Sequence, residues 1–283
     1  MRYVTVQMAL ELGVFTRSTL RKRANTLRKR FGVGYLLGSS TKIEASNAVD
    51  TPYISYIQYL SPDTEYTQAT GIAAPSLCPF ATPACSAVCL GKTSGRMRFT
   101  ANKRARINRT ALFHSGLENY FTVLVDEIVR VRDKAKRDGL KLALRLNGTS
   151  DILWERFNVD IFGFQFGNIL ECFPDVVFYD YTKVPVKHRL DAVDTESYKL
   201  TYSYSERSDS IERASEYSEN GAGVAIVYTG EPLEALGKLG LDRSNVVNGD
   251  EHDMRFLDPP NAKVLLKAKG AAVRDRSGFV VHA

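Results

Sequence analysis

The chain has 283 residues, of which 44% are hydrophobic and 25% are charged, a composition typical of a globular protein rather than a disordered chain. No apolar run reaches the roughly 20 residues that a membrane span needs, so we expect no membrane partner. The polar, basic N-terminus lacks the apolar stretch of a secretory signal, which favours a reducing intracellular compartment.

The formal net charge of +6 is concentrated in residues 1–34, which carry eight Lys and Arg side chains and one acid, Glu11. The pattern there predicts a short helix that ends near Gly13 and a second helix capped by Thr16 or Ser18. We therefore divide the chain into a basic helical extension, residues 1–34, and an α/β barrel-like domain, residues 35–283. Cations on the second helix are candidate contacts for nucleic-acid phosphates, with a merely solvated basic face as the alternative. These cations are Arg21, Lys22, Arg23, Arg28, Lys29 and Arg30.

After residue 34, short β-rich runs alternate with helical stretches, which predicts βα units and a mainly parallel sheet. Apolar residues at helical spacing indicate a long helix over residues 117–131, and residues 249–261 show no evident helix. Seven predicted strands favour an α/β fold with a complete or partial (β/α) barrel, and an open doubly wound sheet is the alternative. The strands cover residues 53–60, 140–147, 175–181, 198–205, 223–229, 245–248 and 262–268.

Polar residues follow several of these strands, at the ends where barrels of this kind carry their sites. Ordinary polar loops are the alternative explanation for any one of these groups. The turn NGTSD follows the second predicted strand and is our candidate for cofactor binding, through Asn147, Gly148, Thr149, Ser150 and Asp151. The candidate catalytic residues, after the third and sixth strands, are Asp180, Lys183, Asp250, His252 and Asp253.

Three of the four cysteines, Cys78, Cys85 and Cys89, lie within twelve residues of the loop after the first predicted strand. Clustered cysteines in a reducing compartment indicate metal binding or catalysis, and thiolates are ligands for zinc and for iron–sulfur clusters. Three ligands would suit a [4Fe–4S] cluster with one iron free for a substrate or cofactor. Two alternatives stay open, namely a zinc site completed by Cys172 or His114 and three unmetallated cysteines that pack as small hydrophobes.

A basic run follows the cysteines directly, with seven cations and no acid between Lys92 and Arg109. Cations beside thiolates lower the pKa of the thiol, and they can equally bind the phosphates of a nucleotide or nucleic acid. A solvated helix face is the alternative. The candidate nucleic-acid contacts in this run are Arg98, Lys103, Arg104 and Arg106.

Several blocks of the sequence together resemble the gene product eighty-eight family of phage proteins. They occur in the same order along the chain and extend over roughly residues 36–283. The resemblance implies a phage or prophage protein that acts in the cytoplasm of the bacterial host, and it implies no particular reaction. The matching blocks are LSP (60–62), CPFATPACSAVCL (78–90), RARINRT (104–110), RLNGTSD (145–151), FPDVVFYDYTKVP (173–185), NGDEHDMRFLDP (248–259) and LLKAKG (265–270).

By analogy, the layout is similar to that of radical SAM enzymes, which carry a cysteine loop after the first strand of a partial barrel. The analogy implies a [4Fe–4S] cluster on the three cysteines, S-adenosylmethionine at residues 147–151, and a nucleotide, nucleic acid or peptide as substrate. The cysteine spacing here is C-x6-C-x3-C, which departs from the C-x3-C-x2-C spacing of those enzymes. Two competing hypotheses are a nucleic-acid-binding accessory protein with structural cysteines or zinc, and a non-catalytic interaction scaffold.

Overall fold

The computed structural model describes residues 4–62, 64–93, 95–193 and 195–283. All seven predicted strands are formed, as β2, β3 and β6 to β10, and the long predicted helix is α8, which extends to Arg137. The strands are β1 (Leu37–Gly38), β2 (Tyr53–Gln58), β3 (Lys141–Arg145), β4 (Asn158–Ile161), β5 (Phe164–Asn168), β6 (Val177–Thr182), β7 (Tyr198–Ser203), β8 (Gly223–Thr229), β9 (Val246–Asn248), β10 (Lys263–Lys267) and β11 (Val280–His282).

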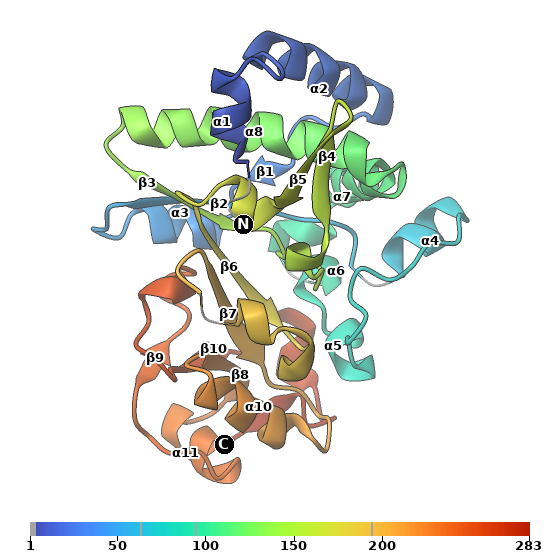
Figure 1. The fold of residues 1–283 in the computed structure, drawn as a ribbon. Coiled ribbons are helices and arrows are strands. Elements are labelled where there is room, and N and C mark those ends of the chain that lie inside the picture. Colours follow the sequence, from blue (N-terminus) through green and yellow to red (C-terminus); the bar gives the residue numbers. More distant parts are fainter. Residues whose placement is uncertain (1–3, 63, 94, 194) are drawn as a thin grey trace.

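Helices lie around the sheet (Figure 1), and short 3₁₀ segments occur in several of the connections. The α-helices are α1 (Val6–Glu11), α2 (Arg17–Phe31), α3 (Thr41–Asn47), α4 (Glu65–Thr70), α5 (Pro83–Ala87), α6 (Leu90–Thr93), α7 (Thr100–His114), α8 (Leu117–Arg137), α9 (Ile169–Cys172), α10 (Ser210–Glu219) and α11 (Pro232–Lys238). The 3₁₀ segments are η1 (Gly95–Arg98), η2 (Trp154–Arg156), η3 (Val186–His188), η4 (Leu190–Ala192), η5 (Arg255–Leu257) and η6 (Gly270–Arg274).

Parallel strands form the centre of the main sheet, in the order β2-β3-β6-β7-β8-β10. This order follows the sequence, as expected when consecutive βα units are laid side by side. β1 pairs antiparallel with β2 at one edge, and β9 pairs parallel with β10 at the other. Two strands pair with β8 besides β10: β7 pairs with the first residues of β8, and β11 pairs with its last residues. The carboxyl ends of the central strands therefore share one edge of the sheet.

The sheet does not close on itself. In the described part of the chain, β1 and β9 end the strand order and do not pair with each other. The α/β class is confirmed, whereas a complete barrel is not formed. Closure requires a full set of tilted, staggered strands, and here β9 has only three residues and joins the outer side of β10. The segment between them contains η5 and no α-helix, which agrees with the prediction for residues 249–261.

The two faces of the sheet differ in chemistry, because side chains alternate along a strand. Leu144, Phe178 and Tyr202 are among the buried apolar residues that form one core with helices α8 and α10. The other face has smaller and more polar side chains, such as Ser55, whose hydroxyl lies 2.6 Å from the hydroxyl of Tyr179. The face covered by α8 and α10 thus supplies the main hydrophobic core, and the opposite face carries more of the polar side chains.

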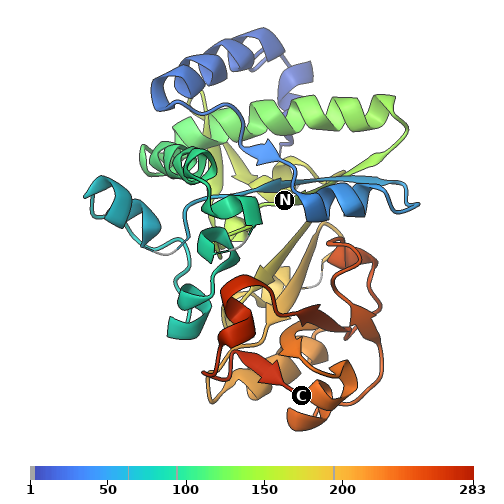
Figure 2. The same cartoon turned by 180° about the vertical axis from the view of Figure 1, so that it is seen from behind.

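The two N-terminal helices pack above α8 (Figure 2). The predicted cap is present, because the Thr16 hydroxyl accepts a hydrogen bond from the backbone of Thr19 at the start of α2. Leu20, Ala24 and Leu27 of α2 are buried and belong to the same hydrophobic core as the sheet. Residues of the basic extension therefore contribute to the core of the main domain.

Candidate functional site at the carboxyl ends of the strands

The cysteine segment, which we define as residues 78–89, lies between β2 and β3 in sequence and is held by the ends of other strands. Cys78 Sγ lies 3.6 Å from the carbonyl oxygen of Thr149, which follows β3. Cys85 lies in α5, and its backbone amide donates to the capping hydroxyl of Thr82 at 3.1 Å. One contact thus positions the Cys78 thiol, and the other fixes the backbone at Cys85.

Glu206, just after β7, anchors the start of α5. Its carboxylate accepts hydrogen bonds from the hydroxyl of Thr82 at 2.8 Å and from the backbone amide of Ala84 at 3.1 Å. A carboxylate at a helix N-terminus satisfies amides that have no partner within the helix. Next to this anchor, Ala84 and Val88 pack with Phe279 and with smaller apolar residues from the C-terminal part of the chain. The segment therefore contacts the ends of β3 and β7 and residues beside β11.

The side chain of Lys183 is buried next to the cysteine segment. Its ammonium group donates to the carbonyl and hydroxyl oxygens of Ser203 at 2.9 and 2.7 Å and to the carbonyl of Tyr204 at 3.2 Å. Burial lowers the pKa of Lys183, and negative charge on Cys85, Asp151, Glu206 and Cys78 opposes that shift. Two of the cysteines thus lie within electrostatic reach of one fixed cation, which also has a hydrogen bond for each of its three protons.

The Cys89 thiol is stabilised in the protonated form. Burial raises the pKa of Cys89, and the charge of a neighbouring Cys85 thiolate raises it further. Two uncompensated thiolates close together would repel each other in a site of low polarity. The third thiol, Cys78, has its own contact with Thr149. Burial and the charge of Cys85 therefore disfavour a Cys89 thiolate unless a cation compensates it.

Cys172 and His114, the predicted alternatives for completing a zinc site, lie in other surroundings. Cys172 is buried in the main hydrophobic core, and burial raises the pKa of its thiol to about 12. The His114 ring packs on Tyr66 and Phe113. Within the described residues, no three His, Cys, Asp or Glu side chains form a group that could hold a metal ion as they stand.

The NGTSD turn is tied together by its own asparagine. The Asn147 side-chain oxygen accepts hydrogen bonds from the Ser150 hydroxyl, the Ile152 amide and the Trp154 indole at 2.8 to 3.2 Å. The backbone amide of Asn147 donates a hydrogen bond to the carboxylate of Asp180 at 2.6 Å. Burial is the main cause that raises the pKa of Asp180 to about 7. These side chains hold the turn in shape and join β3 to β6.

Gly148 and Thr149 bring this turn close to the end of β2. A Cβ atom on Gly148 would lie 2.4 Å from the carbonyl oxygen of Gln58, so only glycine fits there. The Thr149 hydroxyl donates to the carbonyl of Leu60 at 2.5 Å. Its side chain also fills the space beside Gly91 of α6. The turn therefore supports the cysteine segment directly.

Asp151 connects the turn to Lys183 and to a buried arginine. Its carboxylate accepts from the Lys183 backbone amide at 2.8 Å and lies 3.6 Å from the guanidinium of Arg189. Arg189 is only 2% exposed and pairs with Glu155 at 2.8 Å. Burial raises the pKa of Asp151, and the charge of Arg189 counteracts it. This network of hydrogen bonds and ion pairs rigidifies the ends of β3 and β6 next to the cysteine segment.

A second buried polar group lies on the face of the sheet opposite α8 and α10. Asp253, which is 1% exposed, pairs with Arg145 of β3 at 2.7 Å and with Lys42 of α3 at 3.0 Å. The Arg145 guanidinium lies over the ring of Tyr181, 4.4 Å from its centroid. Among the described residues, the Tyr181 hydroxyl is buried without a hydrogen-bond partner. The charge of Arg145 also lowers the pKa of Asp180, which links the two groups electrostatically.

The five candidate catalytic residues thus belong to four groups with different partners. Asp180 and Lys183 lie in the network below the cysteine segment, and Asp253 lies in the arginine group just described. Asp250 instead binds Lys269 and the backbone amide of Lys267 near the surface, at 2.7 and 3.0 Å. The His252 ring lies 3.1 Å from the guanidinium of Arg255.

Sequence reasoning did not select Arg145, Arg189 or Glu206 as site residues. Glu206 had one signal, its position directly after the predicted strand 198–205. Arg145 lies within a strand and Arg189 lies after η3, so nothing in their local sequence shows that each pairs with a distant carboxylate.

The cations of α2 separate into two sets. Arg21 and Arg28 bind Asp126 of α8 at 2.6 and 2.8 Å, and Arg28 also reaches Glu127 at 3.1 Å. These two predicted nucleic-acid contacts are therefore occupied by an internal helix interface. The cations on the exposed side of the helix are Lys22, Arg23, Lys29 and Arg30.

The cations of the second basic run also separate. Arg106 is 1% exposed and binds the carboxylate of Glu65 with its Nε and Nη2 atoms. Arg98, Lys103 and Arg104 are exposed. Only these three of the four predicted contacts in this run are therefore open to a partner.

The comparisons with known proteins place the chain in a family. No curated protein and no solved structure matches the chain, so the analogy with radical SAM enzymes gains no support. No helix among the described residues has the length and apolar character needed to cross a bilayer. The family model described as gene product 88 matches residues 35–283, which begins where the predicted main domain begins. The chain therefore belongs to the gene product 88 family, as its sequence blocks predicted.

Proposed function

We propose that the protein is a phage or prophage enzyme whose cysteine segment holds an iron–sulfur cluster, a [4Fe–4S] cluster ligated by Cys78, Cys85 and Cys89. One observation supports this proposal most strongly. At the carboxyl ends of parallel strands, Cys78 and Cys85 lie within electrostatic reach of the buried ammonium group of Lys183, and Cys89 lies within reach of Cys85. This is the edge of an α/β sheet at which ligands usually bind. Its action belongs in the reducing cytoplasm of the bacterial host, where thiols stay free.

The donor chemistry fits a soft metal. Thiolates select iron–sulfur clusters and zinc, and burial disfavours the Cys89 thiolate until a cation compensates it. Metal binding deprotonates its thiol ligands and couples to the ordering of the segment that carries them. Because the sulfurs do not form a closed ligand set as they stand, we expect the segment to close around the metal. A cluster with three cysteine ligands leaves one iron for a substrate or cofactor.

The surrounding residues would hold and tune such a cluster. The ammonium group of Lys183 offsets the negative charge of the thiolates, and Glu206 fixes the helix that carries Cys85. The NGTSD turn contacts the cysteine segment, and Asp151 binds the backbone amide of Lys183 beside it. The substrate class is a nucleotide, a nucleic acid or a peptide. Use of S-adenosylmethionine at residues 147–151 stays a prediction.

A second candidate function is that of a nucleic-acid-binding accessory protein whose cysteines are structural or bind zinc. It is favoured by the outward row of Lys22, Arg23, Lys29 and Arg30 on α2, which faces away from α8. Phosphate contacts of this kind give binding that weakens steeply with salt. Deleting residues 1–34 would be a poor test, because that segment supplies part of the core.

Single cysteine variants test the cluster proposal. Cys78→Ala, Cys85→Ala and Cys89→Ala should each lose most of the iron that the wild-type protein retains after anaerobic reconstitution, since each removes a ligand. Cys172→Ala is the matched control, because this cysteine lies in the hydrophobic core, and it should retain wild-type iron. Equal iron in all four variants would contradict the proposal. Zinc in place of iron, absent from the same three variants, would favour the second candidate.

A further inference from the structure

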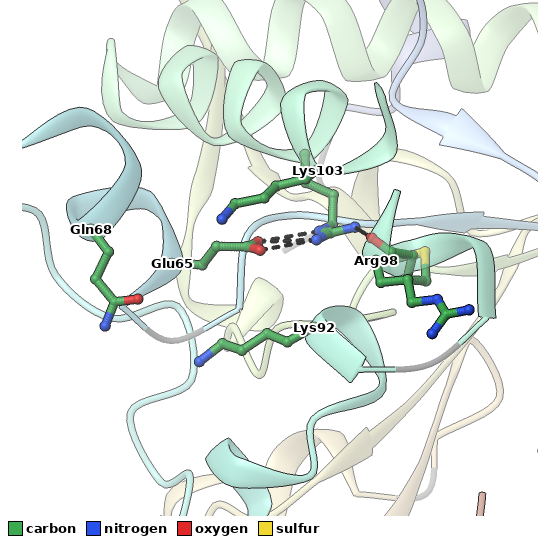
Figure 3. Close-up of a pocket in the computed structure, with 7 residues that line it drawn as sticks. Glu65, Gln68, Lys92, Arg98 and Lys103 are labelled. Atoms are coloured by element: carbon green, nitrogen blue, oxygen red, sulfur yellow. Dashed lines mark hydrogen bonds and ion pairs between the residues drawn. The ribbon is translucent and has the colours of Figure 1, made fainter. Parts of the chain in front are cut away.

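A cavity of about 220 Å³ lies beside the cysteine segment (Figure 3). It is enclosed by α4 on one side and by α6, η1 and α7 on the other. The residues that line it are Glu65, Gln68, Lys92, Met97, Arg98, Lys103 and Arg106. It differs from the proposed cluster site, because none of the three clustered cysteines lines it.

The floor of the cavity is a fixed ion pair. Arg106 donates to both carboxylate oxygens of Glu65 at 3.0 to 3.3 Å and to the carbonyl of Met97 at 2.8 Å. Both side chains are almost fully buried. A bidentate pair of this kind has a rigid geometry. Glu65 carries the one carboxylate among the lining residues. Its ion pair with Arg106 neutralises this charge and holds α4 against α7.

The rim of the cavity carries positive charge that this carboxylate does not balance. Arg98 and Lys103 are exposed, and no ion pair to either is formed within the described residues. In Figure 3 the amines of Lys92 and Lys103 extend on either side of Glu65 toward Gln68, whereas Arg98 extends the other way. A hollow lined by one sign of charge focuses the field and concentrates ions of the opposite sign.

We propose that this cavity binds a phosphate group, held by the Lys103 ammonium and the Gln68 side-chain amide, with Arg98 adding positive charge at the rim. Lysine and arginine are the usual partners of phosphate oxygens. The volume is below the roughly 300–1,000 Å³ of typical small-molecule pockets. It therefore suits one phosphate group better than a whole nucleotide. The inference is independent of the cluster proposal.

The surface next to the cavity indicates where the rest of the ligand would lie. Arg104 is exposed beside Lys103, and one turn further along α7 the Asn108 amide donates to the carbonyl of Gly32 at 3.0 Å. That hydrogen bond brings α7 to the end of α2, whose last turn carries Lys29 and Arg30. Phosphate is the shared chemistry of two sources, a free nucleotide and the backbone of a nucleic acid.

Binding measurements with three probes test the inference: inorganic phosphate, ATP, and a labelled single-stranded DNA oligonucleotide. The double variant Arg98→Gln/Lys103→Gln should weaken binding at least about tenfold, since it removes the Lys103 ammonium group that would bind the phosphate and the positive charge of Arg98 at the rim. Gln68→Glu should also weaken it and Gln68→Lys should strengthen it. The matched control, Lys134→Gln/Lys187→Gln, removes two exposed cations elsewhere and should bind as the wild type does.

The probes also separate the two sources. A nucleic-acid ligand predicts that the oligonucleotide binds more tightly than ATP, and that the salt slope falls by about 0.7 for each phosphate that a variant no longer neutralises. A free nucleotide predicts that ATP binds at least as tightly as the oligonucleotide. The inference is overturned if no probe binds the wild-type protein, or if Arg98→Gln/Lys103→Gln binds like the control. Cysteine variants that lose iron but still bind phosphate would separate this inference from the proposed function.

Discussion

Asp180 shows how one buried carboxyl group holds the strand ends together. It is 1% exposed and accepts hydrogen bonds from the amide of Asn147 and the hydroxyl of Tyr198. Burial outweighs these hydrogen bonds and raises its pKa to about 7. The folded protein therefore holds a proton at Asp180 over a pH range in which the unfolded chain has released it. That difference makes stability depend on pH.

We predict that the free energy of unfolding falls between about pH 4 and pH 7 because of Asp180. An acid whose pKa is raised in the folded state stabilises the fold below its unfolded pKa, and this contribution disappears as the pH rises through the folded pKa. The contribution is at most about 4 kcal/mol, at 1.36 kcal/mol for each unit of pKa. Urea unfolding across this range should show a smaller decline for Asp180→Asn. Parallel curves for the two proteins would contradict the prediction.

Glu206 is the residue whose removal should free the cysteine segment. Glu206→Ala leaves the Thr82 hydroxyl and the Ala84 amide without their acceptor, which should lower the free energy of unfolding by about 1–3 kcal/mol. It should also speed the labelling of Cys85 by a thiol reagent. Glu212→Ala, on the exposed side of α10, is the control and should change neither measurement. An unchanged labelling rate in Glu206→Ala would show that Glu206 does not hold α5.

At the scale of elements, α2 illustrates which features of a basic helix a local sequence pattern can reveal. Its apolar stripe and its Thr16 cap were both predictable, because they depend on local spacing. The acids that neutralise Arg21 and Arg28 lie about a hundred residues away on α8, so no local pattern reveals them. The helix therefore has an inner set of cations that hold the fold and an outer set that stays available to a partner.

Two double variants with the same spacing should separate these roles. Arg21→Gln/Arg28→Gln should lower the free energy of unfolding by about 2–3 kcal/mol, because Asp126 and Glu127 are buried and lose their cations. Most of this effect should come from Arg28, since Arg21 is half exposed and its ion pair is screened by solvent. Lys22→Gln/Lys29→Gln should leave stability within about 0.5 kcal/mol. Equal destabilisation in both variants would contradict this assignment.

At the scale of the whole molecule, the sequence was sufficient to predict the main strands. It was not sufficient to predict the order of the strands at the β8-β10-β9 end of the sheet. Each predicted strand is a local run of β-formers and is present. The position of β10 between β8 and β9 is a long-range choice that no local pattern encodes. The β4–β5 hairpin was also missed, because its turn uses Phe162 and Gly163 at positive φ and lacks the usual Asn-Gly or Asp-Gly signal.

The difference between local patterns and long-range strand order also explains which parts of the candidate site were predictable. The NGTSD turn and Lys183 meet the cysteine segment because they follow adjacent parallel strands, β3 and β6. Asp250 follows β9, which lies at the far edge of the sheet beyond β10, and it binds Lys269 there instead. Residues after strands whose order follows the sequence thus lie beside the cysteine segment, whereas Asp250 after β9 does not.

The most direct test of the central proposal is the iron and acid-labile sulfide content of the wild-type chain after anaerobic purification. The proposal predicts about four irons and about four sulfides per chain, with broad visible absorbance that disappears on chelation or oxidation. A protein that stays free of iron after anaerobic reconstitution, or that carries zinc in its place, would contradict it.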